Sequence, residues 1–433
     1  MKLVKLSLAA IVAAGALTNL ASATSLEEAI KNVDVTGYAR YRFDSQNAKL
    51  GSFKDTDNTH RFTSDIDFKA AIDDNFFGVI GFRYDSVDYS GERANARTMV
   101  GVDDEGADYF GQTFNVRQFY LGYTAGNTTV TAGRQVLGTF FTDDMVGTGI
   151  KVLNSDISGL TLVGMAFDNL QDDADTGTRL LLLGNKASVD DGKVVGGEYV
   201  DDRNLYGAAA IGSYDPVSFQ LWYAALDSVA QLYALDVTVG ANLGDVDLSL
   251  QAQAAGSSVW AHNYRTADKD KDGKLFLTNF GDNNLDDATF LAVELGAKAF
   301  GFDGSVGYIN LNTQGDGISL ISFEDQGGFI TAGEDLLDYT KFAYDANIYF
   351  ITAGYTFADK VRVGADYVGA RIDGEIINGK ALNADAYEAV ARVDYKYSKK
   401  LNFKAWYSYV DVDQYNKNKK DTKHLRFEAR YNF

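Results

Sequence analysis

The last ten residues of the chain, 424–433, alternate strictly between apolar and polar side chains. One parity carries Leu425, Phe427, Ala429, Tyr431 and Phe433. Successive side chains of an extended strand point to opposite faces, so this segment predicts a strand with one apolar face and one charged face. The same alternation runs from Val33 to Phe43.

Segments with this period-two pattern recur along the whole chain, separated by short turns that alternate with long loops. The predicted strands lie near residues 33–43, 61–72, 76–86, 113–124, 128–135, 149–154, 160–167, 205–213, 217–226, 230–241, 245–255, 288–299, 303–311, 347–357, 361–370, 385–397, 401–411 and 424–433. We therefore predict about eighteen strands, with sixteen as the alternative. An even number lets the last strand close against the first.

A closed sheet follows if these strands cross a membrane. After its first residues the sequence has no apolar run near the roughly 18 residues that a membrane helix requires. Hydrocarbon offers no hydrogen bonds to backbone groups, so a spanning sheet must close on itself. Pro216 is the single proline, as expected where almost every strand pairs on both sides. The charged inward faces favour a wide, water-filled lumen, so the predicted fold is all-β, a transmembrane antiparallel β-barrel.

The first 23 residues have the features of a secretory signal peptide. Lys2 and Lys5 precede an apolar run, and Ala21-Ser22-Ala23 is a cleavage pattern, so we expect cleavage before Thr24. Residues 24–433 then form a single barrel domain. The formal net charge of −20 argues against nucleic acid as a partner.

Several short segments, in order along the chain, resemble the Campylobacter-type major outer membrane protein, a family of general porins. They are residues 1–8, 26–31, 115–118, 146–151, 205–210, 361–366, 388–397 and 401–403. The resemblance implies an eighteen-stranded, homotrimeric porin in the outer membrane of a Gram-negative bacterium. Such a porin contacts outer-membrane lipid, passes ions and small hydrophilic solutes, and favours cations. The aromatic end of the chain, with Tyr431 and Phe433, resembles the signal that outer-membrane assembly machinery reads.

In general porins the third loop folds into the barrel, and the resemblance implies the same for residues 136–148, which contain Asp143 and Asp144. A surface loop with solvated acids is the alternative. Arginines on the polar parity of strands near the barrel seam form a candidate basic wall, namely Arg40, Arg42, Arg61, Arg83, Arg392, Arg426 and Arg430. Acids facing these arginines across a narrow gap would produce a transverse field that sorts ions. Pairing with neighbours such as Asp65, Asp85 or Glu428 is the alternative.

Two acidic groups are candidates for the calcium that the resemblance implies. Asp268, Asp270 and Asp272 match the first half of a calcium loop, although its twelfth position is Asn279 and a solvated acidic turn is the alternative. The second group comprises Asp143, Asp144, Asp168, Glu324 and Asp325. The sequence does not rank the two groups, and no other cofactor is required.

The sequence as a whole predicts a non-enzymatic general diffusion porin with weak cation preference. A substrate-selective channel, whose basic wall recognises carboxylates or another anionic solute, is the first alternative. A structural or adhesive barrel with variable surface loops is the second. An outer-membrane hydrolase would need a serine beside a histidine, and His424 would neighbour Ser408 across the predicted last hairpin, a proximity that is common by chance. No nucleophile motif surrounds Ser408.

Overall fold

The described chain is an all-β structure built on one antiparallel sheet of 18 strands. A computed structural model describes residues 33–50, 53–91, 114–171, 180–190, 193–199, 203–260, 264–269, 275–278, 285–314, 318–323, 326–337, 344–377, 380–414 and 419–433. The predicted signal peptide lies outside these residues. Among the residues described, no helix is long and apolar enough to cross a membrane.

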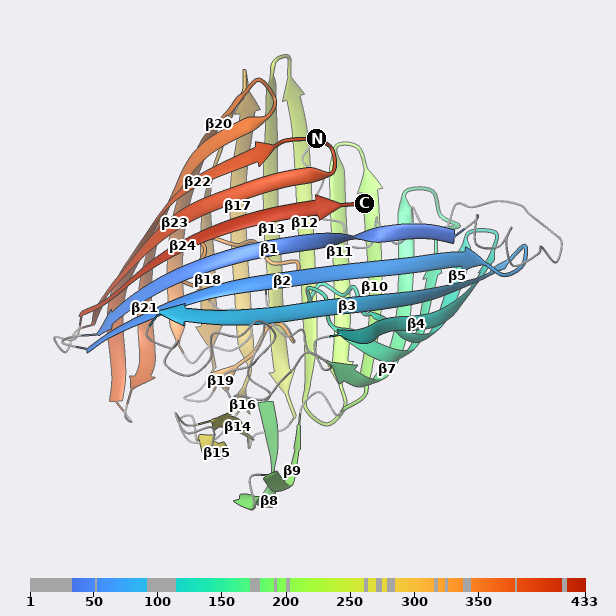
Figure 1. The fold of residues 1–433 in the computed structure, drawn as a ribbon, viewed down its shortest axis with the longest axis horizontal. Helices are drawn as coiled ribbons and strands as arrows, with labels where there is room; N and C mark the ends of the chain where they lie inside the picture. The colour runs from blue at the N-terminus through green and yellow to red at the C-terminus, as the bar shows by residue number, and fades with distance from the viewer. Residues whose placement is uncertain are drawn as a thin grey trace.

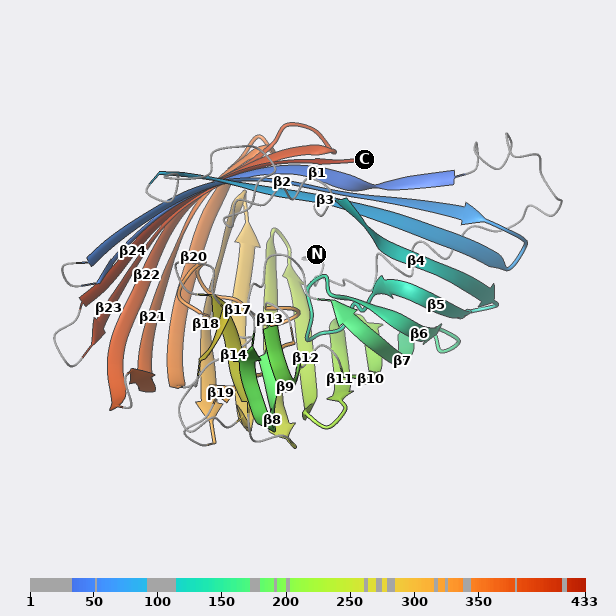
Figure 2. The same cartoon turned by 60° about the horizontal axis from the view of Figure 1, so that its bottom comes forward.

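The sheet closes into a barrel at the two ends of the chain. β1 (Val33–Leu50) pairs with β2 (Phe53–Ala71) on one side and with β24 (Lys419–Asn432) on the other. The backbone N–H of Phe433 donates to the carbonyl of Gly37 at 3.1 Å and extends this seam. Both views show β1, β2 and β24 side by side (Figures 1 and 2). The predicted closure of the last strand against the first is confirmed.

The remaining barrel strands follow in chain order, each antiparallel to the next. They are β3 (Phe76–Gly91), β4 (Phe114–Ala125), β5 (Thr128–Val136), β6 (Val146–Asn154), β7 (Leu160–Gln171), β10 (Leu205–Tyr214), β11 (Val217–Leu226), β12 (Ala230–Leu243), β13 (Val246–Val259), β17 (Ala288–Ala299), β18 (Phe302–Thr313), β20 (Asp345–Phe357), β21 (Val361–Ile377), β22 (Lys380–Lys396) and β23 (Leu401–Gln414). Each of the predicted strands corresponds to one barrel strand, so the prediction of eighteen is confirmed.

Several strands continue well beyond their predicted ends. The predicted strands 33–43 and 61–72 leave a long loop over residues 45–59 between them. This predicted loop was wrong, because β1 and β2 stay paired as far as Leu50 and Phe53. Outside the hydrocarbon both faces of a strand meet water, and polar residues on both faces then no longer mark its end. β21 and β22 are likewise paired as far as Ile377 and Lys380.

Two long stretches between predicted strands, residues 168–204 and 257–287, contain short strands of their own. β8 (Leu180–Asp190) pairs with β9 (Lys193–Tyr199) and with β14 (Tyr264–Lys269), which pairs with β15 (Leu275–Thr278). This four-stranded sheet lies at the lower edge of the barrel in Figure 1. A second, parallel pair joins β16 (Leu285–Asp286) to β19 (Ile318–Ser319).

The outward face of the barrel is apolar. Exposed large side chains occur on strands all around it, among them Phe119, Leu121, Leu221, Leu291, Leu295, Val306, Tyr349, Ile351 and Tyr367. On β24 the exposed large apolar residues are Leu425, Phe427 and Tyr431, which belong to the parity predicted to face lipid. A continuous apolar exterior of this extent is typical of a barrel surrounded by hydrocarbon.

The interior is divided between an apolar part and a charged part. Inward side chains of the strands from β10 to β22 include fully buried apolar residues such as Trp222, Leu232, Phe290 and Ile348. The expectation of a charged lumen was therefore wrong for this part of the wall. Chain segments fold inward and cover these residues, because wall side chains alone do not fill so wide a barrel.

A charged substitution on the outward face tests the membrane-facing assignment. We expect Leu295→Arg on β17, where Leu295 is 50% exposed, to destabilise the folded barrel by about 2–4 kcal/mol if the residue lies near the bilayer midplane. Leu295→Ile keeps the surface apolar and should change little. Urea unfolding in lipid vesicles measures both, and equal stabilities of the two variants would contradict the assignment.

Candidate functional site

The loop between β5 and β6, residues 137–145, folds into the barrel. At its base the buried Lys151 ammonium group donates to the carbonyls of Val136 and Leu137 at 2.8 and 3.0 Å. At its tip the carbonyl of Phe141 accepts hydrogen bonds from the backbone N–H of Phe323 and the hydroxyl of Ser322, each at 2.8 Å. The prediction of an inward third loop is confirmed.

A second inward segment, which the sequence did not predict, comprises residues 318–323 and 326–337 between β18 and β20. The ring of Phe329 packs on Phe140 of the third loop and on Phe290 of β17, with ring centroids 4.8 Å apart in both cases. The two inward segments therefore form one apolar cluster with the adjacent wall.

Side chains that bind backbone groups hold the second inward segment on two strands. Glu388 of β22 is fully buried and accepts hydrogen bonds from the backbone N–H groups of Glu334, Asp335 and Leu336 at 2.9, 3.1 and 3.2 Å. Gln253 of β13 donates to the carbonyl of Gly328 and accepts from the N–H of Ile330 at 3.0 and 2.7 Å. The segment thus spans the lumen between β13 and β22.

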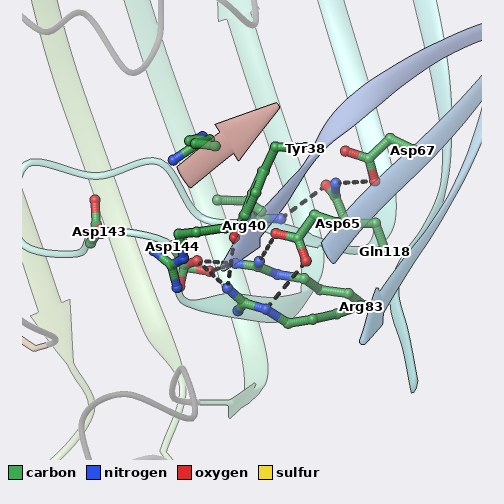
Figure 3. Close-up of a pocket in the computed structure, with 11 residues that line it drawn as sticks. Tyr38, Arg40, Asp65, Asp67, Arg83, Gln118, Asp143 and Asp144 are labelled. Carbon is green, nitrogen blue, oxygen red and sulfur yellow. Dashed lines mark hydrogen bonds and ion pairs between the residues drawn. The ribbon is translucent and has the colours of Figure 1, made fainter. Parts of the chain in front are cut away.

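Four charged side chains tie the third loop to the neighbouring strands β2, β3 and β4, and Figure 3 labels three of them, Asp65, Arg83 and Asp144. Arg83 of β3 contacts Asp65 of β2 at 3.2 Å and Asp144 of the loop at 3.0 Å. Arg117 of β4 contacts the same two carboxylates at 2.6 and 2.9 Å. Each arginine bridges both acids and each acid receives both arginines, so the cluster is neutral. We call these residues the four-membered ion-pair cluster.

The environment of Asp144 keeps its carboxyl group ionised. Burial raises the pKa of this group, but the guanidinium groups of Arg117 and Arg83 lower it by more, and the pKa lies below its ordinary value. Asp144 therefore carries a negative charge throughout the neutral pH range.

A cavity of about 300 Å³ lies beside this cluster. It is lined by Tyr38, Arg40, Asp65, Asp67, Arg83, Arg117, Gln118, Val136, Asp143, Asp144 and Arg430. Arginine and aspartate contribute four residues each, so the wall carries both signs of charge. Asp143 is exposed and lies on the loop, apart from the four-membered ion-pair cluster (Figure 3).

Only three of the seven predicted arginines, Arg40, Arg83 and Arg430, line this cavity. The other four pair with neighbouring carboxylates: Arg42 with Glu428, Arg61 with Asp85, Arg426 with Asp44, and Arg392 with Asp366 and Glu334. For these four, the structure favours the alternative of local pairing. Asp144 also differs from the prediction, because it contacts two arginines directly and does not face them across a gap.

Arg117 is a site residue that strict alternation misses. By strict alternation Arg117 would point outward like Phe119. The register between β3 and β4 shifts at Phe82, however, which pairs with Val116. Arg117 is therefore an extra residue in β4 without a partner position on β3. Such a bulge re-aims side chains. Val116 is accordingly 42% exposed on the outer face, whereas Arg117 is 7% exposed and points inward. The sequence carries no signal for this shift.

Ser408 and His424 are register partners across β23 and β24, as the hydrolase alternative required, but each side chain forms its hydrogen bonds with other residues. The Ser408 hydroxyl donates to Glu388 at 2.6 Å. The ring nitrogens of His424 lie 2.8 and 2.9 Å from carboxylate oxygens of Asp335 and Asp44. His424 therefore links the second inward segment to the wall.

Four of the eight calcium candidates lie outside the described residues, namely Asp270, Asp272, Glu324 and Asp325. Asp268 lies in β14 and Asp168 in β7. Over the part of the chain that the structure describes, no three histidine or acidic side chains gather as a metal site. Calcium binding stays a prediction from the sequence.

A closed barrel with an apolar exterior, narrowed by inward segments beside a charged cavity, defines the class of outer-membrane channels. The chain belongs to the family of the Campylobacter major outer membrane protein, whose family model matches residues 1–433. It is an outer-membrane porin of a Gram-negative bacterium and forms a pore. No curated protein matches its sequence.

Solved structures of outer-membrane channels share the fold at low sequence identity. OccK9 (OpdG) of Pseudomonas aeruginosa has a TM-score of 0.63 and 12% identity, with 94% of this chain and 100% of that chain covered. A BenF-like porin from Pseudomonas fluorescens Pf-5 has a TM-score of 0.63 and 14% identity, with coverage of 93% and 99%. OccAB4 of Acinetobacter baumannii has a TM-score of 0.62 and 10% identity, with coverage of 92% and 98%.

The anchor at Glu388 generates a testable prediction. Glu388→Gln places an amide N–H₂ group among backbone donors, and loss of this charged acceptor costs about 1–3 kcal/mol or more. We expect the second inward segment to loosen, so that single-channel conductance rises and becomes noisier in planar bilayers.

Asp394→Asn is the matched control, because it removes the same charge from the same strand. Among the ion pairs of the described residues, Asp394 takes part only in a contact of 3.8 Å with Arg362. An equal rise in both variants would assign the effect to charge and contradict the anchoring role.

Proposed function

We propose that this porin passes ions and small hydrophilic solutes passively and discriminates among them by size and by charge, with a mild preference for cations. The observation that carries the proposal is the cavity that holds Asp143 and Asp144 together with Arg40 and Arg430. The chain performs no chemistry on the solute.

Filtering by size rests on the two inward segments, which occupy part of the lumen and are anchored by Lys151, Gln253 and Glu388. Filtering by charge rests on residues beyond the neutral four-membered ion-pair cluster. Asp143 is exposed on the loop, whereas Arg40 and Arg430 belong to the strands of the seam. Charges of opposite sign around a narrow cavity are poorly screened and act on dipolar solutes and ions. The net charge of −20 supports the cation preference.

A channel selective for one solute is the second candidate. Structures with the same fold hold vanillate in OpdK, at a TM-score of 0.60 and 11% identity, and glucuronate in OccK2 (OpdF), at 0.59 and 14%, both from Pseudomonas aeruginosa. Both molecules carry a carboxylate, and the arginines of the seam suit such a group. This candidate requires that one solute permeates liposomes far faster than others of its size.

Assembly into a homotrimer and insertion by outer-membrane assembly machinery are parts of the same proposal. The resemblance to the porin family supports the trimer. The exposed ring of Tyr431 and the aromatic terminal residue Phe433 support a C-terminal recognition signal on the outer face of β24.

Selectivity tests the role of the third loop. In a salt gradient across a planar bilayer, we expect a reversal potential that favours potassium over chloride. Asp143→Asn removes one charge from the cavity and should lower the permeability ratio by about two- to fivefold. Asp156→Asn removes the same charge from a turn between β6 and β7 and should leave the ratio unchanged. An anion preference of the unmodified channel would contradict the proposal.

Deletion of Phe433 tests the C-terminal signal separately from the pore. We expect less protein in the outer-membrane fraction, with the reversal potential of the inserted channels nearly unchanged. Phe433→Tyr keeps an aromatic end and should insert normally. If the deletion variant inserted normally but had altered selectivity, Phe433 would act on the pore and not on insertion, and the proposed signal would be refuted.

A further inference from the structure

Two arginines stand directly opposite each other at the seam of the barrel. Arg40 of β1 is the register partner of Arg430 of β24, and both line the cavity. Like charges in directly opposed positions destabilise a strand pair. The pair is therefore unfavourable for the fold alone, which points to a use in the pore.

The contacts of Arg430 leave the two terminal nitrogens of its guanidinium group available to a carboxylate. Its Nε donates to Asn432 at 3.0 Å, and its guanidinium group lies over the ring of Tyr38, 3.9 Å from the centroid. Among the residues that the structure describes, no carboxylate lies within 4.0 Å of Arg430, and its terminal nitrogens have no hydrogen-bond partner. By contrast Arg426, four residues earlier on the same strand, has Asp44 at 2.5 Å.

The geometry suits a planar anion. The two terminal nitrogens of a guanidinium group match the two oxygens of a carboxylate, which gives paired, charge-assisted hydrogen bonds. Stacking on Tyr38 holds the plane of the group and reduces the ordering that binding requires. The cavity of about 300 Å³ is at the lower end of the range for small-molecule sites.

We propose that Arg430, held against Tyr38, binds the carboxylate group of a solute within the pore. This inference rests on the proposed function, because the site is reached from the lumen. It makes the cavity a carboxylate subsite within a pore that otherwise favours cations. A negatively charged solute thus meets a local site that offsets the repulsion of the acidic chain.

Benzoate serves as the probe, with benzamide as its neutral analogue of the same shape. We expect benzoate to reduce the single-channel conductance of the unmodified protein in a saturable way at constant potassium chloride, and benzamide to have no effect. Arg430→Gln should raise the half-blocking concentration by at least about tenfold. Arg426→Gln, which removes an arginine already paired with Asp44, should leave it unchanged.

A binding measurement separates this inference from the proposed function. NMR titration of benzoate against the protein in detergent requires no current, and we expect binding that Arg430→Gln weakens and Arg426→Gln does not. Absence of current with this binding pattern would refute the porin function alone. Equal benzoate affinity of the unmodified protein and Arg430→Gln would overturn the subsite.

Arg430→Lys keeps the charge and protects the test against misfolding of the glutamine variant. A lysine ammonium group carries the charge but lacks the two parallel N–H donors of a guanidinium group, so we expect an intermediate loss of benzoate affinity. Unchanged affinity would overturn the two-point geometry.

Discussion

The structure depends on one constraint, which is that hydrocarbon offers no hydrogen bonds to a peptide backbone. A sheet that crosses a membrane must therefore have no edge, and β1 and β24 supply the last pairing that removes it. The same constraint explains the strict alternation along each strand, since one face meets lipid and the other meets the lumen. The positions of Arg40 and Arg430 follow from this closure, because the seam brings the two ends of the sequence together.

A barrel of 18 strands is too wide for its own wall to fill, so its interior is built from added chain. Two inward segments pack apolar rings against the strands around β17, where Phe140, Phe329 and Phe290 meet. Glu388 and Gln253 satisfy backbone groups that this burial would otherwise leave without partners. The charged cavity lies against the strands near the seam, away from this apolar packing.

The features that the membrane imposes were predictable from the sequence, and those that depend on tertiary contacts were not. Alternation located every barrel strand, but it placed an end of β1 near Phe43, because polar residues beyond the hydrocarbon are compatible with strand and loop alike. Parity placed Arg61 on an inward face and Asp85 was one possible partner, but the choice between pairing and a place in the basic wall depends on the register between β2 and β3. Glu388 gave no signal, because its partners are backbone groups of a distant segment.

The bulge in β4 shows that the chemistry of the lumen depends on residue count as well as residue type. One extra residue turns Arg117 inward and keeps Phe119 and Leu121 on the lipid side. Without that residue in the register, the strand could not present both Arg117 and Gln118 to the interior, and Asp65 and Asp144 would share a single arginine. A one-residue deletion upstream of Phe119 can thus change the charge of the pore as strongly as a substitution in it, while every remaining side chain keeps its identity.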